Sequence, residues 1–513
     1  MMLEMKNIFA KSIAIVLAGI SLASCDLNLY PEGSIVYDEE KGFFTNLDDV
    51  YGAETAVYAN FKATTGGFYS FLEDLMFDGF NATLSYGNNY GSIHKTDSGF
   101  NTGDQDVESF WGNYYLTMKN YNVTIDAADA APEDVAEDAR FVKGEACAAR
   151  AYAYLQLARH FGPKYDEATA DVDLCVPLVL HYDQNARPKR NTMAEVYEQI
   201  LEDLDSAYVI LTDYEVENKP NSLYFTPDAV KAMMARALLD MGDYEAAADT
   251  AVSVIESAAG YELATTAKQL DSLRSLDLGK EAIMQLFASS TETPNGYGLF
   301  TSFEKDSKSS TGYSYYRPYF LPTKTLMDLY ENNDIRKIAW FHQVVDNPIC
   351  IEGGYANNVY VFSKYAGNPN YTSTGLPTGL VASKPFMISE MYLIAAEGYF
   401  QSGDNTNAKK YLNMLQAKRK ATPSALSMET IQKEWNRETV CEGLRLTNMK
   451  RWDIGFEGRL PQTNAVSLIM STPKEVFEDK ELEAGDKVFC WPIPSYEIKI
   501  NPNLEQNPGY GTN

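Results

Sequence analysis

Histidine, cysteine and basic residues are scarce in this 513-residue chain, and each scarcity excludes a class of site. The four histidines are dispersed and no HExxH motif occurs, so a zinc site is not expected. The six cysteines form no CxxC pair, which argues against a disulfide framework. Lysine and arginine total 43 against 71 acidic residues. The resulting net charge of −28 argues against nucleic-acid binding, because phosphates require a basic surface.

Catalytic motifs are also missing. The chain contains no GxSxG nucleophile elbow and no P-loop. A glycosidase needs two carboxylates that face each other across a sugar, and no pair stands out among the 71 acidic residues. We therefore expect a binding protein and not an enzyme, with a surface glycosidase as an alternative. No cofactor is expected. The spacing of an EF-hand is absent, although the sequence leaves open whether a structural calcium ion is bound.

The N-terminus carries the features of a lipoprotein signal. Lys6 and Lys11 precede an apolar stretch of ten residues, 13–22, which is too short to cross a bilayer that needs about 20. The stretch ends in Leu-Ala-Ser-Cys, the pattern of a bacterial lipobox. Residues 1–24 are therefore predicted to be cleaved, and Cys25 to be acylated and to anchor the chain. The alternative is an ordinary signal peptide with a chance cysteine.

Helical spacing dominates the segments that follow. Apolar residues recur at intervals of three and four over 48–62 and 105–130, and a strong helical pattern over 135–161 stops at a Gly-Pro pair. Thr192 and Glu195 have the spacing of a capping box that opens a further helix. The pattern predicts a mainly α-helical protein.

Two distant segments resemble each other and tetratricopeptide repeats. In both 229–255 and 389–417, a helix rich in alanine and leucine reaches a Gly-Asp turn. A small residue, Ala247 or Ala408, stands five positions after each glycine. Small residues at that place let paired helices approach closely. We expect two helix pairs of this type, too few and too far apart for a long solenoid.

Aromatic residues are abundant, with 35 tyrosines, 24 phenylalanines and 5 tryptophans. Most of them are expected to pack in the core. Two segments without periodicity, 79–104 and 290–322, combine aromatics with Gly, Asn and Ser, and 346–384 is also irregular. Long loops of this kind tend to be functional, and aromatic faces suit sugar rings or extended peptides. The candidate ligand-binding residues are Tyr86, Asn88, Tyr90, Phe100, Tyr313, Tyr315, Tyr316 and Arg317.

The C-terminal segment is rich in proline and asparagine. It reads WPIPSYEI over 491–498, NPNL over 501–504 and QNPGY over 506–510. Prolines fix φ and remove backbone donors, so this strip is predicted to be extended and not helical. We expect the tail to wrap the outside of a helical body.

A cluster of glutamates precedes this tail. Glu434, Glu438 and Glu442 are spaced four apart and would repel one another on one helix face. Arg445, three residues after Glu442, is expected to relieve this repulsion. We interpret these charges as a structural ion-pair network and not as a ligand or catalytic site.

These segments closely resemble the SusD/RagB family of nutrient-binding lipoproteins. The tail and the lipobox are the most specific matches, and Asn448 is a departure because the family more often has Asp there. The departure puts one local charge pair in doubt. The segment from Asn436 to Trp452 resembles a second family signature. Weaker matches are spread along the chain, at Trp111, Tyr115, Asn122, Glu145, Arg150, Tyr152, Phe161, Asp334 and Arg336.

The resemblance implies helix pairs of the tetratricopeptide type that support an irregular, loop-rich binding face. It implies a signal peptide over 1–24 and an N-terminal region over 25–225, packed as one unit with a C-terminal region over 226–513. It further implies a lipid-anchored location on the outer surface of the outer membrane, with no other membrane contact. The protein would then capture glycans for a SusC-like TonB-dependent transporter. Peptides are the alternative ligand. A purely structural repeat protein that binds no nutrient is the alternative function.

Overall fold

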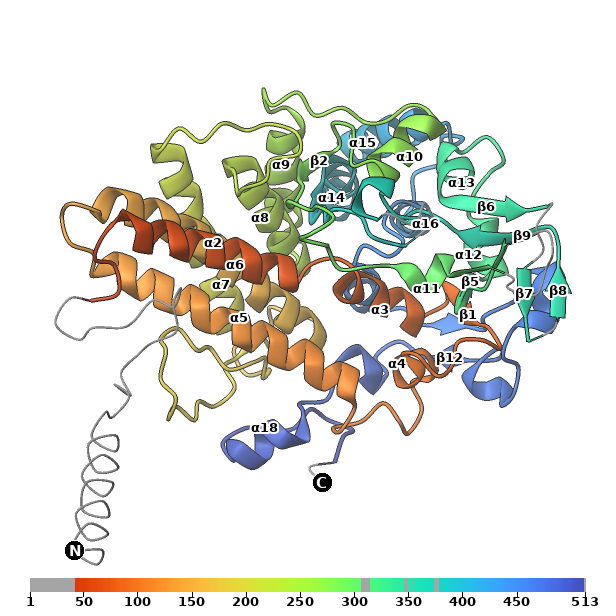
Figure 1. Cartoon of the computed structure of the whole chain (residues 1–513), viewed down its shortest axis with the longest axis horizontal. Helices are drawn as coiled ribbons and strands as arrows, with labels where there is room; N and C mark the ends of the chain where they lie inside the picture. The colour runs from red at the N-terminus through yellow and green to blue at the C-terminus, as the bar shows by residue number, and fades with distance from the viewer. Residues whose placement is uncertain (1–41, 306–313, 346–348, 353, 373–377, 512–513) are drawn as a thin grey trace, which may run out of the picture.

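The structure is a computed structural model that describes residues 42–305, 314–345, 349–352, 354–372 and 378–511. Helices dominate it, as the sequence predicts. The long helices gather on the left and in the centre of Figure 1, and most of the short strands gather on the right. The predicted signal peptide and Cys25 lie outside the described residues.

The first long helices follow the predicted boundaries. They are α2 (Leu47–Ala63), α5 (Gln105–Asp129) and α6 (Ala136–Phe161). Asn46 caps α2 and Asp104 caps α5, each accepting hydrogen bonds from two free backbone N–H groups of the first turn. These local capping signals explain why the helix boundaries could be predicted from the sequence.

Helix α7 (Met193–Asp213) begins with the predicted capping box. The Thr192 hydroxyl accepts from the Glu195 backbone, and the Glu195 carboxylate accepts from the Thr192 backbone. The helix packs against α6.

Both predicted helix pairs are present. The first is α8 (Pro227–Met241) with α9 (Tyr244–Ile255), and the second is α14 (Ile388–Gln401) with α15 (Asn405–Arg419). Although they are far apart in sequence, α14 packs directly on α9, so the two pairs form one stack. Gly398 permits this contact, because a Cβ there would lie 2.4 Å from the Tyr244 carbonyl oxygen.

The remaining helices are short. They are α3 (Phe68–Met76), α4 (Gly91–Lys95), α10 (Ala267–Ser275), α11 (Gly298–Thr301), α12 (Lys324–Asp328), α13 (Ile335–Trp340), α16 (Met428–Glu438), α17 (Arg445–Trp452) and α18 (Ser495–Ile500). Single 3₁₀ turns are η1 (Pro369–Tyr371), η2 (Thr463–Leu468), η3 (Lys474–Val476) and η4 (Lys487–Phe489).

Short strands occur in and around the segments that the sequence analysis left irregular. The described strands form antiparallel pairs: β1 (Phe80–Ala82) with β5 (Phe320–Pro322), β2 (Ala282–Met284) with β10 (Phe386–Met387), β3 (Phe303–Lys305) with β4 (Ser314–Tyr316), β6 (Phe341–Val344) with β9 (Val359–Phe362), β7 (Ile349–Ile351) with β8 (Gly354–Ala356), and β11 (Phe456–Glu457) with β12 (Glu481–Leu482). Strands of two to four residues leave almost no periodicity to detect.

The prediction for the C-terminal tail was wrong in two respects. The side chains of Trp491 and Ile493 are fully buried, so this part of the tail enters the core instead of covering the outside. The strip around the prolines is non-helical as expected, but helix α18 begins directly after Pro494. The Trp491 ring packs edge-on against Phe110 of α5 and against His160 at the end of α6.

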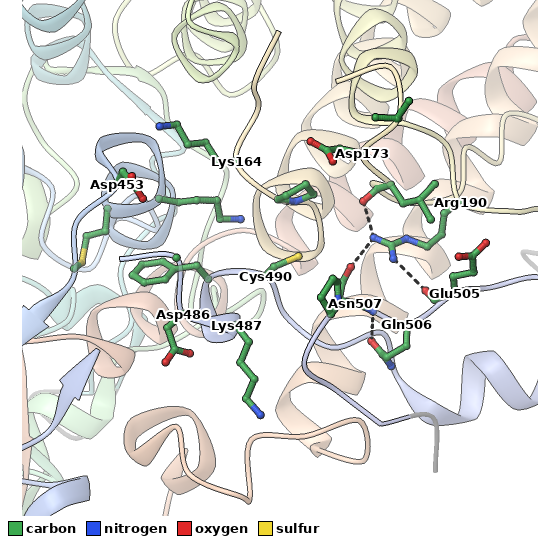
Figure 2. A pocket seen from close by; sticks show the side chains of 18 of the residues that line it. Lys164, Asp173, Arg190, Asp453, Asp486, Lys487, Cys490, Glu505, Gln506 and Asn507 are labelled. Atoms are coloured by element: carbon green, nitrogen blue, oxygen red, sulfur yellow. Dashed lines mark hydrogen bonds between the residues drawn. The ribbon is translucent and has the colours of Figure 1, made fainter. Parts of the chain in front are cut away.

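The tail also helps to terminate α6. The last carbonyl groups of a helix lack intrahelical partners, and cations are favourable there. Lys450, which lies in α17, donates to the carbonyl oxygen of Arg159 at 2.6 Å. Asn507, which lies in the tail, donates to the carbonyl oxygen of Phe161 at 2.9 Å. Figure 2 shows Asn507 bonded in turn to Arg190, at 2.7 Å. The tail is therefore a cap for a central helix.

The glutamate cluster is a buried ion-pair network, as the sequence predicts, but one partner was predicted wrongly. Helix α16 ends at Glu438, so Glu442 falls on the next turn, where it pairs with Arg274 and Lys364. Arg445 instead pairs with Asp78, at 2.8 Å.

The departure at Asn448 breaks no charge pair. The Asn448 side-chain oxygen accepts from Arg451 at 3.0 Å, and the same guanidinium pairs with Glu397 at 2.8 Å. An amide is sufficient at this position because Glu397 already supplies the negative charge.

Buried Asp74 makes stability depend on pH. Burial, and then the charge of Glu73, raise its pKa to about 8. A carboxyl whose pKa is raised on folding stabilises the folded state when it is protonated. For Asp74 this stabilisation is complete below the unfolded pKa of about 4, and it is lost as the pH rises through the folded pKa of about 8. We expect Asp74→Asn to gain stability relative to wild type between pH 5 and pH 8, by more than the roughly 1.4 kcal/mol of one pKa unit.

Urea unfolding at both pH values measures this difference. The exposed Asp205→Asn exchange is the control and should show no such trend. A constant difference between Asp74→Asn and wild type across this range would show that Asp74 is ionised in the folded protein.

Candidate functional site

The structure brings the two predicted aromatic loops together. Strand β1 of the first loop pairs with β5 of the second. Beyond the strands, the Thr83 backbone N–H donates to the Tyr319 carbonyl oxygen at 2.9 Å, and the Thr83 hydroxyl donates to that of Pro318 at 2.8 Å. Strands β1 and β5 lie side by side on the right of Figure 1, so the two loops meet there although they are far apart in the sequence.

Arg317 is a second side chain that joins the two loops. Its Nε donates to the Ser85 hydroxyl at 3.0 Å, and its terminal nitrogen pairs with the Glu352 carboxylate at 3.1 Å. These contacts hold a partly exposed guanidinium in a fixed orientation, in which a ligand hydroxyl could accept from it.

Residues 86–90 form a tight turn, here named the asparagine turn. Asn88 and Tyr90 both have positive φ values, 59° and 52°, which are unfavourable for residues with a Cβ atom. The mostly buried Tyr86 donates from its hydroxyl to the Asn88 side-chain oxygen at 3.2 Å. Asn88 and Asn89 are left exposed at the tip, where amide groups can bind hydroxyls.

Two further candidates in the first loop pack inward. Tyr90 is half-buried and its ring lies edge-on to Phe71, at 5.1 Å between centroids. Phe100 is only 2% exposed, and its ring packs against Trp491 and Tyr510. Phe100 therefore belongs to the core beside the tail and offers no ring face to a ligand.

Tyr316 faces a broad surface cavity of about 680 Å³, here named the hairpin hollow. The side chains that give it its chemistry include Tyr316, His342, Tyr360, Lys337 and Gln343. The Tyr316 and His342 rings lie 5.7 Å apart, and the Lys337 ammonium lies 5.7 Å from the Tyr360 ring. Partly exposed rings with nearby donors and acceptors suit a ligand that presents apolar faces and hydroxyl groups.

A separate small core supports Tyr316. It comprises Leu321, Val344, Ile349, Ile351, Ala356, Val359, Val361, Ala465, Leu468 and Ile469. Tyr316 packs against this core while it lines the hairpin hollow, and burial raises the pKa of its hydroxyl. Tyr313 and the side chain of Tyr315 lie outside the described residues, so their candidacy stays a prediction.

Sequence reasoning missed His342, Tyr360 and Lys337. One signal was present: Tyr360 stands between two valines, 359 and 361, which are fully buried, so its side chain must point to the other face of strand β9. The strand is only four residues long and lies in a segment that was read as irregular.

A second cavity, of about 460 Å³, lies at the capped end of α6 (Figure 2). Lysines such as Lys164 and Lys487 and acids such as Asp173 and Asp486 surround it in balanced numbers. None of the predicted site residues lines it. The described ranges contain no cluster of His, Cys, Asp and Glu that could hold a metal ion.

No described helix is both long and apolar enough to cross a membrane.

Comparison with known proteins identifies the family. Residues 344–510 match a model described as SusD family, and residues 47–239 match one described as starch-binding, associating with outer membrane. No curated protein sequence matches the chain.

Solved structures share the fold. A SusD superfamily protein from Bacteroides thetaiotaomicron has a TM-score of 0.72 at 21% identity, covering 90% of this chain and 99% of that one. A putative sugar binding protein from Bacteroides vulgatus has a TM-score of 0.71 at 22% identity, covering 93% and 100%. A laminarin binding SusD-like protein has a TM-score of 0.68 at 19% identity, covering 91% and 100%.

The two family models together span well over half of the chain, and the match over 344–510 includes the second helix pair and the proline-rich tail. The chain belongs to the SusD/RagB family.

Proposed function

We propose that this protein is a lipid-anchored cell-surface protein that captures oligo- or polysaccharides and delivers them to a SusC-like TonB-dependent transporter in the outer membrane. The observation that carries the proposal is the meeting of two distant loops beside the hairpin hollow. There, the partly exposed ring of Tyr316 and the exposed ring of His342 line the hollow, and Arg317, the next residue after Tyr316, is held by Ser85 and Glu352. Two findings support it: the starch-binding description of one family model, and a structural relative described as laminarin binding.

The proposed ligand contacts divide into two kinds. Tyr316 and His342, with Tyr360 beside them, would stack on sugar rings through their exposed faces. Arg317 and Asn88 would hydrogen-bond hydroxyl groups from the neighbouring loops. We propose that Tyr313 and Tyr315, from the same hairpin segment, add further contacts.

The protein is proposed to bind glycans without cleaving them. A glycosidase would need two carboxylates across the bound sugar, and Asp271 is the one acidic residue that lines the hairpin hollow in the described part of the chain. A protein that captures glycans for a transporter is expected to deliver them uncleaved.

Replacing Tyr316 by alanine tests this site. We expect the affinity for a bound glycan to fall about tenfold, equivalent to about 1.4 kcal/mol, because one stacking face is lost. Isothermal titration with laminarin, amylopectin and galactomannan measures the effect. Tyr182, which is exposed beside α5, provides the matched control when changed to alanine. Equal affinity in both variants would remove the hairpin hollow from the ligand site.

A further inference from the structure

A second groove runs along helix α2, and none of the candidate ligand-binding residues lines it. It has a volume of about 520 Å³ and is here named the α2 groove. Helix α2 contributes Glu54, Thr55, Tyr58, Ala59 and Lys62, and two other segments contribute Leu223, Tyr224, Leu286, Phe287 and Glu292. From Glu54 to Lys62 the helix rises about 12 Å, so the groove is long enough for several linked rings.

Three large apolar side chains are exposed in this groove. Leu223 is 41% exposed, Tyr224 51% and Phe287 52%. Single exposed apolar residues are ordinary on a protein surface, but a cluster within a concave groove indicates a binding site. The side chain of Ala59 is too small to fill the space between them.

The aromatic ring of Tyr224 is held in place before any ligand arrives. It packs edge-on against Tyr58 at 4.9 Å and 87°. Tyr58 is itself fixed, because its hydroxyl donates to Glu145 and accepts from the Phe225 backbone N–H at 2.9 Å. A preorganised ring loses little freedom when a ligand stacks on it.

The polar groups of the groove can hydrogen-bond to hydroxyl groups, and their net charge disfavours anionic ligands. Glu54 is half-buried, burial raises the pKa of its carboxyl, and it makes no hydrogen bond or ion pair with another residue of the described ranges. Lys62 is already paired with Glu292 at 2.7 Å, and its ammonium lies 6.0 Å from the Phe287 ring. The groove therefore carries a net negative charge, which disfavours uronic, sulfated or phosphorylated ligands.

We infer that the α2 groove is a second saccharide-binding site, which takes a neutral stretch of a glycan. The inference rests on the proposed function. A protein partner fits the groove less well, since a stable interface buries about 800 Å² per partner, whereas this apolar surface amounts to three side chains between acidic groups.

The double variant Tyr224→Ala/Phe287→Ala tests the inference. Affinity for whichever of laminarin, amylopectin or galactomannan binds the wild type should fall about tenfold, and Glu54→Gln should weaken it by a smaller factor. The control is Leu116→Ala/Val209→Ala, which removes two exposed apolar side chains from α5 and α7. Combining the groove variant with Tyr316→Ala should weaken binding more than either change alone.

The outcomes separate the two proposals. If no glycan binds the wild type, the proposed function fails and the groove inference fails with it. If Tyr316→Ala weakens binding while the groove variant and Glu54→Gln bind like the control, only the groove inference is overturned. A groove variant that changes self-association in sedimentation, with glycan affinity intact, would assign the groove to a second copy and also overturn it.

Discussion

Replacing Arg336 by alanine is expected to lower the free energy of unfolding by about 3–5 kcal/mol. The Arg336 side chain is fully buried and pairs with Asp334 at 2.7 Å, Glu434 at 2.6 Å and Glu438 at 2.9 Å. Its removal leaves three buried carboxylates with one cation fewer among them, and an uncompensated buried charge is far more costly than a broken surface pair.

The control is an exposed pair on α16, the helix that carries Glu434 and Glu438. Lys433 and Glu429 pair at 2.6 Å with both side chains largely in solvent, so Lys433→Ala should change stability by less than about 1 kcal/mol. Urea unfolding followed by circular dichroism measures both. Equal losses in the two variants would show that the buried network contributes no more than a surface contact.

This network also positions the hairpin hollow. Arg336 lies in α13, and the chain runs from α13 directly into β6, which carries His342. Glu434 and Glu438 lie in α16, so the ion pairs fix α13 against α16. We expect the conservative Arg336→Lys exchange to keep part of the stability, because one ammonium cannot reproduce the forked contacts of the guanidinium.

Replacing Cys25 by alanine is expected to abolish membrane anchoring. The lipobox pattern ends at this residue, and its thiol is the proposed acceptor of the acyl groups. A multiply acylated terminus anchors stably, whereas a single acyl chain gives marginal binding. The wild type should fractionate with the outer membrane, and the variant should appear in the soluble fraction.

Fractionation together with mass spectrometry of the N-terminus measures this effect. Cys350→Ala is the matched control, since Cys350 is a free cysteine in strand β7 and should not affect anchoring. Retention of the Cys25→Ala protein in the membrane would contradict the lipid anchor.

Local signals in the sequence predicted the helical body. The capping box at Thr192 and the alanines after the two Gly-Asp turns act within a few residues, so their consequences can be read from the sequence. The direct packing of α14 on α9 could not be read in this way, because it depends on Gly398 meeting a residue from another repeat.

Long-range contacts explain the errors. Arg445 was predicted to pair with its sequence neighbour Glu442, but its partner Asp78 lies 367 residues away in the sequence. Phe100 and Tyr316 both stand in irregular aromatic segments, yet one packs in the core and the other faces a cavity. Residue type alone does not distinguish these positions, since an aromatic ring suits burial and ligand stacking equally well.

The central claim, a protein that binds glycans without cleaving them, is tested most directly by one titration. Purified protein that begins after Cys25 is titrated calorimetrically with laminarin, amylopectin and galactomannan, and each glycan is then recovered and sized by chromatography. We predict saturable binding of at least one glycan and its recovery at full length. Shortened chains would reveal an enzyme, and the absence of heat with every glycan would contradict glycan capture.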